Sequence, residues 1–431
     1  MREGEISGSA GHRSASCAVA IAGCGAICAT GNGTASLLTA LKNNTSCLRP
    51  NERFTGPRFQ SNIVGTSPID PTSDNPAHQL ASIALREAIS ATKLQACEKP
   101  LTPSLSPSDG ERVADRPGEG TLCAPKFLHI SDAIPAARIG LVLSTTKANI
   151  EALERLSDGR PCSATARRHL QADLLAADLA AEFSALGPVQ NISNACVSGH
   201  VAIMQGAKLI QRGAADAVFV VGVDHLSAFV IGGFTALKAI DPQGCRPFDQ
   251  DRRGLSPGEA GAAIVLVRGD LAPKNSITIS GWGSSNDANH MTGPSRDGAG
   301  LAQAIRTAMS TAKLQTAQID YVNAHGTGTP YNDAMESSAL RTIFGETIPP
   351  MSGIKGMIGH TLGTAGVIET IACVLAMQEK FLPGTPRLNN IAEGFPPSLV
   401  KEPRAATRLN HILKLNTGFG GVNGALILSH E

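Results

Sequence analysis

Two apolar runs far apart in the chain share one pattern, and this repeat constrains the fold more than any other feature. Residues 17–27 read CAVAIAGCGAI, residues 276–285 read SITISGWGSS, and a helical pattern follows each run. Short apolar runs between turn residues are typical of buried strands, and strands alternating with helices favour a sheet with covered faces. The sequence therefore predicts an α/β protein of two repeated halves, residues 17–266 and 267–431, joined through the turn-rich segment VRGDLAPKNS.

The sequence between these runs supplies further elements of such a fold. Apolar runs and helical periodicity predict strands at Val19–Ile27, Arg138–Ser144, Asp216–Asp224 and Asp320–Asn323, and helices at Thr34–Lys42 and His78–Thr92. Two segments have neither pattern. Residues 1–16 are polar and rich in Ser and Gly, so we expect a flexible tail, and residues 97–126 are punctuated by prolines, so we expect a mobile surface insertion.

Composition excludes several classes of function. Lys and Arg total 37 against 36 Asp and Glu, so no long-range field gathers nucleic acid or anionic membrane, and only 3% of residues are aromatic. The ten cysteines contain no CxxC pair, which argues against a zinc site and favours a cytoplasmic location. No run reaches the roughly 18 uninterrupted apolar residues of a membrane helix. We expect no metal, no cofactor, no nucleic acid and no membrane among the ligands of this chain.

One cysteine lies at a turn that precedes an apolar helix. Residues 194–210 read NACVSGHVAIMQGAKLI, in which Cys196 is followed by small residues and then by a helix that is apolar nearly all round. A cysteine in the first turn of a buried helix feels the positive end of the helix dipole, which favours thiolate and lowers the thiol pKa. Cys196 is therefore a candidate nucleophile. The alternative is an ordinary core cysteine.

Three further glycine-rich motifs contain polar groups suited to catalysis. The segment NAHGTGTPYND at residues 323–333 places His325 at the end of a strand, where sites of α/β sheets usually lie. The segment GIKGMIGHTLGTAGVIE at residues 353–369 contains Lys355, His360 and Glu369 among glycines. The segment NTGFGGVN at residues 416–423 is a turn whose backbone N–H groups can face an anion.

The four motifs, in this order, resemble the β-ketoacyl synthase family in its elongating branch, over essentially residues 17–429. The resemblance implies the thiolase fold, a five-layered αβαβα arrangement of two pseudo-repeated halves. It also implies a decarboxylative Claisen condensation of an acyl thioester with malonyl-acyl-carrier-protein, in fatty-acid or specialised polyketide or polyene biosynthesis. The implied partners are an acyl carrier protein, the malonyl and acyl thioesters, and a second subunit in a homodimer or a heterodimer with a related chain.

The resemblance also implies a role for each motif residue. Cys196 would carry the acyl group, and the backbone N–H groups of Cys196 and Phe419 would form the oxyanion hole. His325 and His360 would stabilise the enolate formed when malonyl loses its carboxylate. The remaining implied roles are an ion pair that holds this network (Lys355 and Glu369), hydroxyls that bind the pantetheine arm (Thr327 and Thr329), and a gate over the acyl pocket (Phe419). The alternative for Lys355 and Glu369 is a solvated surface pair. The alternative for Thr327 and Thr329 is that they are plain loop residues.

Two positions depart from the family pattern. Thr417 replaces an aromatic residue before the GFGG turn, and Lys147 stands where an apolar residue normally lines the acyl pocket. Lys147 would bind a polar chain end, pair with a carboxylate or reach water, which indicates a specialised acyl substrate. A different register or a lysine at the dimer interface is the alternative. Competing functions are a non-catalytic chain-length subunit, which would usually lack Cys196, and a decarboxylase or thioesterase that uses the same thiol.

Overall fold

The structure is a computed structural model that describes residues 18–57, 59–95 and 127–430. The predicted tail at residues 1–16 and the predicted insertion at residues 97–126 lie outside these described residues. The predicted strands and helices within them are all found, with ends shifted by at most two residues.

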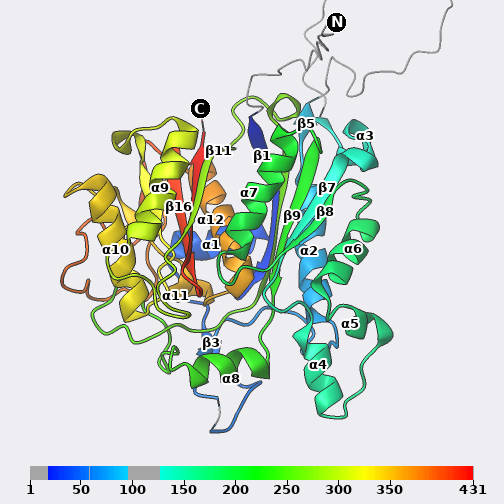
Figure 1. Ribbon diagram of the computed structural model, residues 1–431, viewed down its shortest axis with the longest axis horizontal. Helices are drawn as coiled ribbons and strands as arrows, with labels where there is room; N and C mark the ends of the chain where they lie inside the picture. Colours follow the sequence, from blue (N-terminus) through cyan, green and yellow to red (C-terminus); the bar gives the residue numbers. More distant parts are fainter. Residues whose placement is uncertain (1–17, 58, 96–126, 431) are drawn as a thin grey trace, which may run out of the picture.

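The N-terminal half contains a five-stranded mixed sheet in the order β1-β10-β9-β7-β8. Figure 1 labels four of these strands, β1, β9, β7 and β8. The first two pairings are antiparallel and the last two are parallel. Its strands are β1 (Val19–Cys28), β7 (Ile139–Ser144), β8 (Val189–Ile192), β9 (Ala217–Asp224) and β10 (Ala260–Arg268). Its helices are α1 (Thr34–Asn43), α2 (Pro76–Ser90), α3 (Ile130–Ala133), α4 (Ile150–Ser157), α5 (Ala164–Arg168), α6 (Ala172–Glu182), α7 (Ser198–Gln211) and α8 (Ala228–Ala236).

The C-terminal half repeats this arrangement in the order β11-β17-β16-β12-β13, again with two antiparallel pairings followed by two parallel ones. Its strands are β11 (Thr278–Asn286), β12 (Tyr321–Asn323), β13 (Met351–Ser352), β16 (His411–Gly418) and β17 (Val422–Ser429). Its helices are α9 (Ala299–Ala312), α10 (Pro330–Phe344), α11 (Lys355–Ile358) and α12 (Ala365–Glu379). The remaining short strands are β2 (Gly31–Asn32), β3 (Arg49–Pro50), β4 (Ile63–Val64), β5 (Leu94–Gln95), β6 (Phe127–Leu128), β14 (Phe381–Leu382) and β15 (Arg404–Ala405).

The pattern that the two apolar runs share has a structural cause. Gly25 in β1 faces α2 and Gly283 in β11 faces α9. At either glycine, an added Cβ atom would lie 2.0 Å from a carbonyl oxygen of the facing helix. Only glycine permits this approach. The two sheets join where Ala20 of β1 pairs with Thr278 of β11.

The core separates into the layers of a five-layered αβαβα fold. Along β10, Ala262, Ile264 and Leu266 face the central core beside α7 and α12, whereas Ala263 and Val265 face the outer core beneath α2. This alternation follows from the two-residue period of a strand whose faces are both buried. A third core packs α9 and α10 against the outer face of β16 and β17. In Figure 1 the central helices α7 and α12 accordingly lie between the sheets of the two halves.

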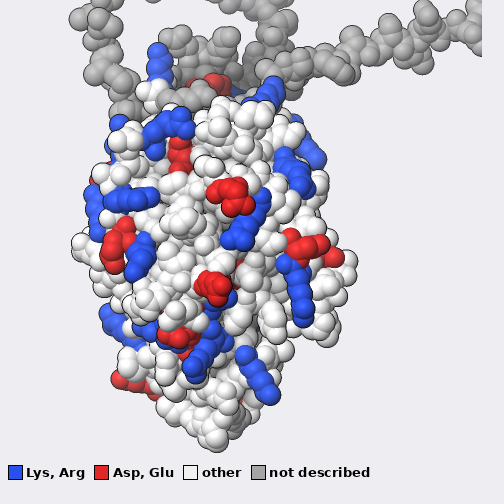
Figure 2. Space-filling view, turned by 90° about the vertical axis from the view of Figure 1, so that its left-hand side faces the viewer, with Lys and Arg blue, Asp and Glu red and all other residues white. Residues whose placement is uncertain are grey.

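Within residues 18–57, 59–95 and 127–430, one helical segment is long and apolar enough to cross a membrane by length and composition: Leu362–Glu379, in the central layer. It is 89% buried inside the molecule, as expected of a core helix that contacts both sheets. On the surface, Figure 2 shows Lys and Arg side chains interspersed with Asp and Glu over one face, in keeping with the near-zero net charge.

Candidate active site

Cys196 lies in a tight turn between β8 and α7. The helix begins at Ser198, so the prediction that Cys196 occupies its first turn is wrong by two residues. Ala195 has a left-handed backbone with φ of 46°, an uncommon conformation for a residue with a side chain. The Ser198 hydroxyl stabilises the turn, because it accepts from the Asn194 N–H at 2.7 Å and donates to the Ala195 carbonyl at 2.6 Å.

A crossing of α7 and α12 places this turn beside the other motifs. A Cβ atom added at Gly199 would lie 2.8 Å from the backbone nitrogen of Val367, and one added at Gly366 would lie 2.3 Å from that of His200. The two helix backbones therefore meet at a pair of glycines. Because the loop that contains His360 leads directly into α12, this crossing brings Cys196 and His360 together.

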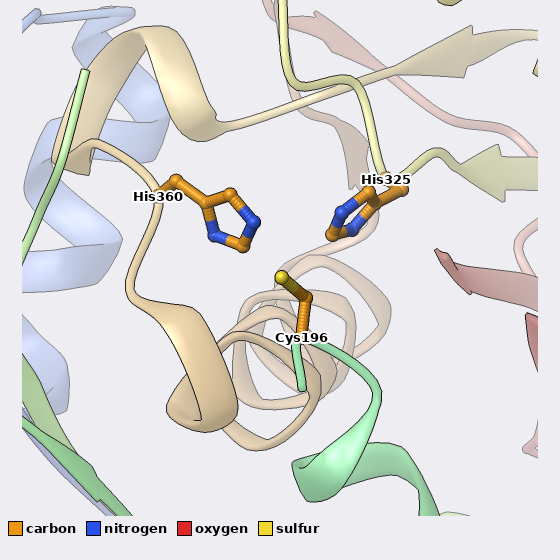
Figure 3. Close-up of side chains that lie close together, drawn as sticks. All are labelled: Cys196, His325 and His360. Carbon is orange, nitrogen blue, oxygen red and sulfur yellow. The ribbon is translucent and has the colours of Figure 1, made fainter. Parts of the chain in front are cut away.

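Three side chains converge at this point. Figure 3 shows the sulfur of Cys196 pointing between the rings of His325 and His360. One ligand-type atom from each lies within 4.8 Å of the other two, and the two rings are nearly perpendicular, with centroids 5.1 Å apart. Cys196 is 7% exposed, and the histidines are 1% and 2% exposed. The structure thus brings together the three residues predicted to be catalytic.

The hydrogen bonds of the two histidines determine which ring nitrogen carries the proton. His325 Nδ1 lies 3.1 Å from Lys355 Nζ and 3.1 Å from Asn416 Nδ2, both of which donate. His360 Nδ1 accepts from the Leu362 N–H at 3.2 Å. A neutral imidazole that accepts at Nδ1 carries its proton on Nε2. Burial, followed by the charge of Lys355, lowers the pKa of both histidines well below 6.5, so both are neutral Nε2–H donors.

A cysteine and two histidines at this spacing are also a conceivable metal-ligand set. A metal needs a lone pair, however, and a protonated Nε2 offers none. The nearby ammonium groups that lower the histidine pKa values, those of Lys355, Lys147 and Lys414, also repel a cation. The arrangement fits two hydrogen-bond donors beside a thiol better than it fits a metal site.

The predicted lowering of the Cys196 pKa is wrong for the unliganded protein. Burial raises the pKa of this thiol to about 11, and this outweighs the lowering by Lys355 and by the Phe419 N–H, which donates a hydrogen bond to it. The helix-dipole expectation did not include the loss of hydration that follows from burial of the thiol. The thiol of the unliganded protein is therefore protonated at neutral pH.

The predicted Lys355–Glu369 ion pair is present and fully buried, which excludes the alternative of a solvated surface pair. Lys355 Nζ also donates to the backbone carbonyl of His325 at 2.6 Å. A second lysine, which sequence reasoning missed, lies on the other side of the carboxylate: Lys414 Nζ is 2.7 Å from Glu369 Oε2. Lys414 is itself fully buried on β16.

A cavity of about 1410 Å³ connects the three catalytic side chains with solvent. Thr327, Thr329 and Phe419 line it together with Cys196, as the family resemblance implies. The two threonine hydroxyls are 2.8 Å apart, and the Phe419 ring lies 6.0 Å from that of Phe234.

Lys147 is not among the residues that line this cavity. Its ammonium lies 3.3 Å from Asp224 Oδ1 and 2.5 Å from the Thr146 hydroxyl, with 13% of the side chain exposed. Of the predicted options for this lysine, pairing with a carboxylate is the one observed. Asp224 in turn accepts from the Gly363 N–H at 2.7 Å, three residues after His360. The pair therefore contacts the loop that carries a catalytic histidine.

Two buried acids that support the His325 loop were also missed. Glu336 on α10 accepts from the backbone N–H groups of His325 and Gly326 at 2.6 and 2.7 Å, and Asp333 accepts from the Gly328 N–H at 3.2 Å. Burial raises the pKa of Glu336 to about 7. Their spacing of three residues, which puts both on one face of a helix directly after the loop, is the sequence signal that would have identified them.

Comparison with known proteins agrees with this geometry. Residues 129–272 match "Beta-ketoacyl synthase, N-terminal domain" and residues 277–389 match "Beta-ketoacyl synthase, C-terminal domain". A putative polyketide beta-ketoacyl synthase 1 of Streptomyces halstedii is 31% identical over 95% of this chain and 97% of its own length. A 3-oxoacyl-[acyl-carrier-protein] synthase 2 of Vibrio cholerae is 36% identical over 59% of this chain and 65% of its own length.

Solved structures extend the likeness to the whole fold. The ishigamide ketosynthase/chain length factor superposes with a TM-score of 0.80 at 26% identity, covering 97% of this chain and 100% of that chain. A ketosynthase (ApeO) in complex with its chain length factor (ApeC) from Xenorhabdus doucetiae gives 0.78 at 26% identity, with 96% and 98% covered. The thiolase fold inferred from the sequence is thereby confirmed. The chain belongs to the β-ketoacyl synthase family, as an acyltransferase that carries out the condensing step of polyketide or fatty-acid synthesis.

Proposed function

We propose that this condensing enzyme elongates a specialised polyketide or polyene chain on an acyl carrier protein, with malonyl-carrier as the extender. The observation that carries the proposal is the pair of neutral Nε2–H histidines beside the Cys196 sulfur. The likeness to a polyketide synthase over nearly the full chain supports the specialised pathway.

The first step transfers the acyl group from the carrier to Cys196. The Cys196 sulfur forms a bond to the thioester carbon, the bond from that carbon to the pantetheine sulfur breaks, and the thiol proton of Cys196 passes to the departing pantetheine sulfur. We assign stabilisation of the tetrahedral oxyanion to the backbone N–H groups of Cys196 and Phe419. The Phe419 N–H already donates to the Cys196 thiol, so it lies close to the reacting atoms.

The second step removes the malonyl carboxylate as carbon dioxide. The electron pair of the broken carbon–carbon bond moves onto the thioester oxygen as an enolate, and we assign His325 and His360 to donate to that oxygen through Nε2–H. The enolate carbon then bonds to the acyl carbon, the bond from that carbon to the Cys196 sulfur breaks, and the sulfur takes up one proton from solvent through the open cavity. Preorganised donors in a site with little water stabilise such developing charge most strongly.

The cavity provides the route for both thioesters. We assign Thr327 and Thr329 to bind the pantetheine arm, because their hydroxyls line the passage between the histidines and solvent. Phe419 would act as the gate over the acyl chain, and the Lys355–Glu369 pair would hold His325.

We also assign acyl selectivity to Lys147. Its ammonium is held by Asp224, and it lies close enough to the site that its charge adds to the burial and the Lys355 charge that lower the pKa of His360. If the acyl chain extends toward this charge pair, the pair would disfavour a saturated chain and favour one with polar groups along its length.

A second subunit is expected to pair along the open edge of the N-terminal sheet. Strand β8 pairs only with β7 among the described residues, so its other edge presents unpaired backbone groups, and Val189 is 41% exposed. The structural relatives described as ketosynthases with a chain length factor support a related chain as this partner.

Separating the two half-reactions tests the proposed roles. His325→Ala and His360→Ala should each lower malonyl-carrier decarboxylation by about 10² to 10³-fold, since each removes one donor to the enolate. Transfer of the acyl group to Cys196 should change far less, as followed by the mass of the intact protein. Loss of acyl transfer with intact decarboxylation in both variants would overturn this assignment. A chain-length subunit would do neither reaction, and a thioesterase would release free acid without a new carbon–carbon bond.

A further inference from the structure

Behind His325, two residues of β16 close a ring of polar contacts. From His325 Nδ1 the ring passes to Lys355 Nζ at 3.1 Å and on to Glu369. It continues from Glu369 Oε2 to Lys414 Nζ at 2.7 Å and from Lys414 Nζ to Asn416 Oδ1 at 3.0 Å. Asn416 Nδ2 returns to His325 Nδ1 at 3.1 Å. All five side chains are 0–1% exposed, so no water competes for these contacts.

The orientation of the Asn416 amide is the feature of this ring with a chemical consequence. An ammonium only donates, so Lys414 requires the oxygen of the amide on its own side. The NH₂ group of Asn416 is thereby turned toward His325. If the amide were flipped, its oxygen would face His325 Nδ1 and would favour a proton on that nitrogen, which would remove the proton from the Nε2 that faces Cys196.

The charges of the ring also favour a neutral His325. Two ammonium groups, those of Lys355 and Lys414, flank the single carboxylate of Glu369, which leaves an excess of positive charge behind the imidazole. Positive charge there disfavours the imidazolium form of His325. Lys355 alone would supply part of this effect, but it does not contact the Asn416 amide, and Lys414 does.

We propose that Lys414 and Asn416 are positioning residues for the condensation: Lys414 orients the Asn416 amide, and Asn416 then holds His325 as the Nε2–H donor that stabilises the enolate. The inference rests on the proposed role of His325 in decarboxylation. It adds two residues to the machinery that neither touch the substrate nor belong to the Cys–His–His set.

Asn416→Asp is the sharpest test, because it exchanges the NH₂ group that faces His325 Nδ1 for a carboxylate oxygen and leaves the size of the side chain almost unchanged. The new carboxylate can still pair with Lys414, which favours folding. We expect decarboxylation to fall by about 10² to 10³-fold, as if one donor were lost, and acyl transfer to Cys196 to stay within a few fold. In protein labelled with ¹⁵N-histidine, the His325 signals should change from the Nε2–H to the Nδ1–H pattern.

Lys414→Met provides a second, independent variant, with Lys42→Met as its matched control, because the Lys42–Glu379 ion pair lies on the surface at 46% and 42% side-chain exposure. Lys414→Met should lower decarboxylation and mix the His325 tautomers, whereas Lys42→Met should change neither. An Asn416→Asp protein that decarboxylates within threefold of wild type, or that keeps the Nε2–H signals, would overturn the inference. Failure of the wild-type protein to decarboxylate malonyl-carrier would instead contradict the proposed function itself.

Discussion

One added methyl group at the crossing of α7 and α12 tests whether this crossing sets the geometry of the site. In Gly366→Ala the new Cβ atom would lie 2.3 Å from the His200 nitrogen and 2.7 Å from the Gly199 carbonyl carbon, both of them backbone atoms that cannot rotate away. Ordinary contacts begin at 3.4 Å, so α7 and α12 must separate by about 1 Å, which moves Cys196 relative to His360.

The size of the effect follows from that displacement. Misplacing reacting groups by about 1 Å costs on the order of 10²-fold in rate, and overpacking a core typically costs about 1–3 kcal/mol of stability. We therefore expect Gly366→Ala to fold, with a lower thermal midpoint, and to form 3-oxoacyl-carrier about 10²-fold more slowly than wild type.

The assay is the rate of product formation from acyl-carrier and malonyl-carrier, with circular dichroism to confirm folding. Gly233→Ala on α8 is the matched control, because nothing lies within 4 Å of the position of its Cβ atom. A folded Gly366→Ala protein with a rate within twofold of wild type would refute the view that this glycine contact positions the site.

Two further predictions concern Lys147 and the buried histidines. Lys147→Ile should shift the preferred acyl chains toward longer saturated ones and leave acylation of Cys196 intact, as measured by competition between acyl-carriers; an unchanged preference would leave Lys147 without a role in selectivity. Stability should fall below pH 6.5, because burial lowers the pKa values of His200 and His225 to about 3, so that only the unfolded chain binds these protons. The loss is about 1.4 kcal/mol per histidine at pH 5.5, and His325 and His360 add to it. Two buried acids with raised pKa values oppose it, Glu336 with a pKa of about 7 and Asp333. Denaturant unfolding at pH 7.5 and 5.5 measures the difference, and equal or greater stability at pH 5.5 would contradict the prediction.

The sequence was sufficient for features that are encoded locally. The strand and helix patterns predicted the repeated halves because β1 and β11 carry the same glycine spacing against their helices. The residue motifs predicted that Cys196, His325 and His360 would meet, because each motif has a short, rigid spacing of its own. The thiol pKa could not be predicted in this way, since it depends on how completely the folded chain buries Cys196.

Contacts between distant segments explain most of what was missed. Lys414 meets Glu369 across 45 residues of sequence, and no local pattern connects the two. A lysine in the middle of the apolar run ILKLN was nevertheless a usable signal, because a lysine inside a buried strand needs a buried partner. The family pattern predicted that Lys147 stands at a position of the acyl pocket. Its partner Asp224 was missed, because it lies at the end of a strand 77 residues away.

The most direct test of the account is the mass of the intact wild-type protein and of its carrier through one turnover. With acyl-carrier alone, the enzyme should gain the mass of the acyl group, located by proteolysis on the peptide that contains Cys196, and Cys196→Ala should gain none. When malonyl-carrier is then added, that mass should leave the enzyme, and the carrier should carry the acyl group lengthened by two carbons as its 3-oxo thioester. An acyl group on another cysteine, or its release as free acid without the two-carbon extension, would contradict the assignment of this chain as a condensing enzyme that works through Cys196.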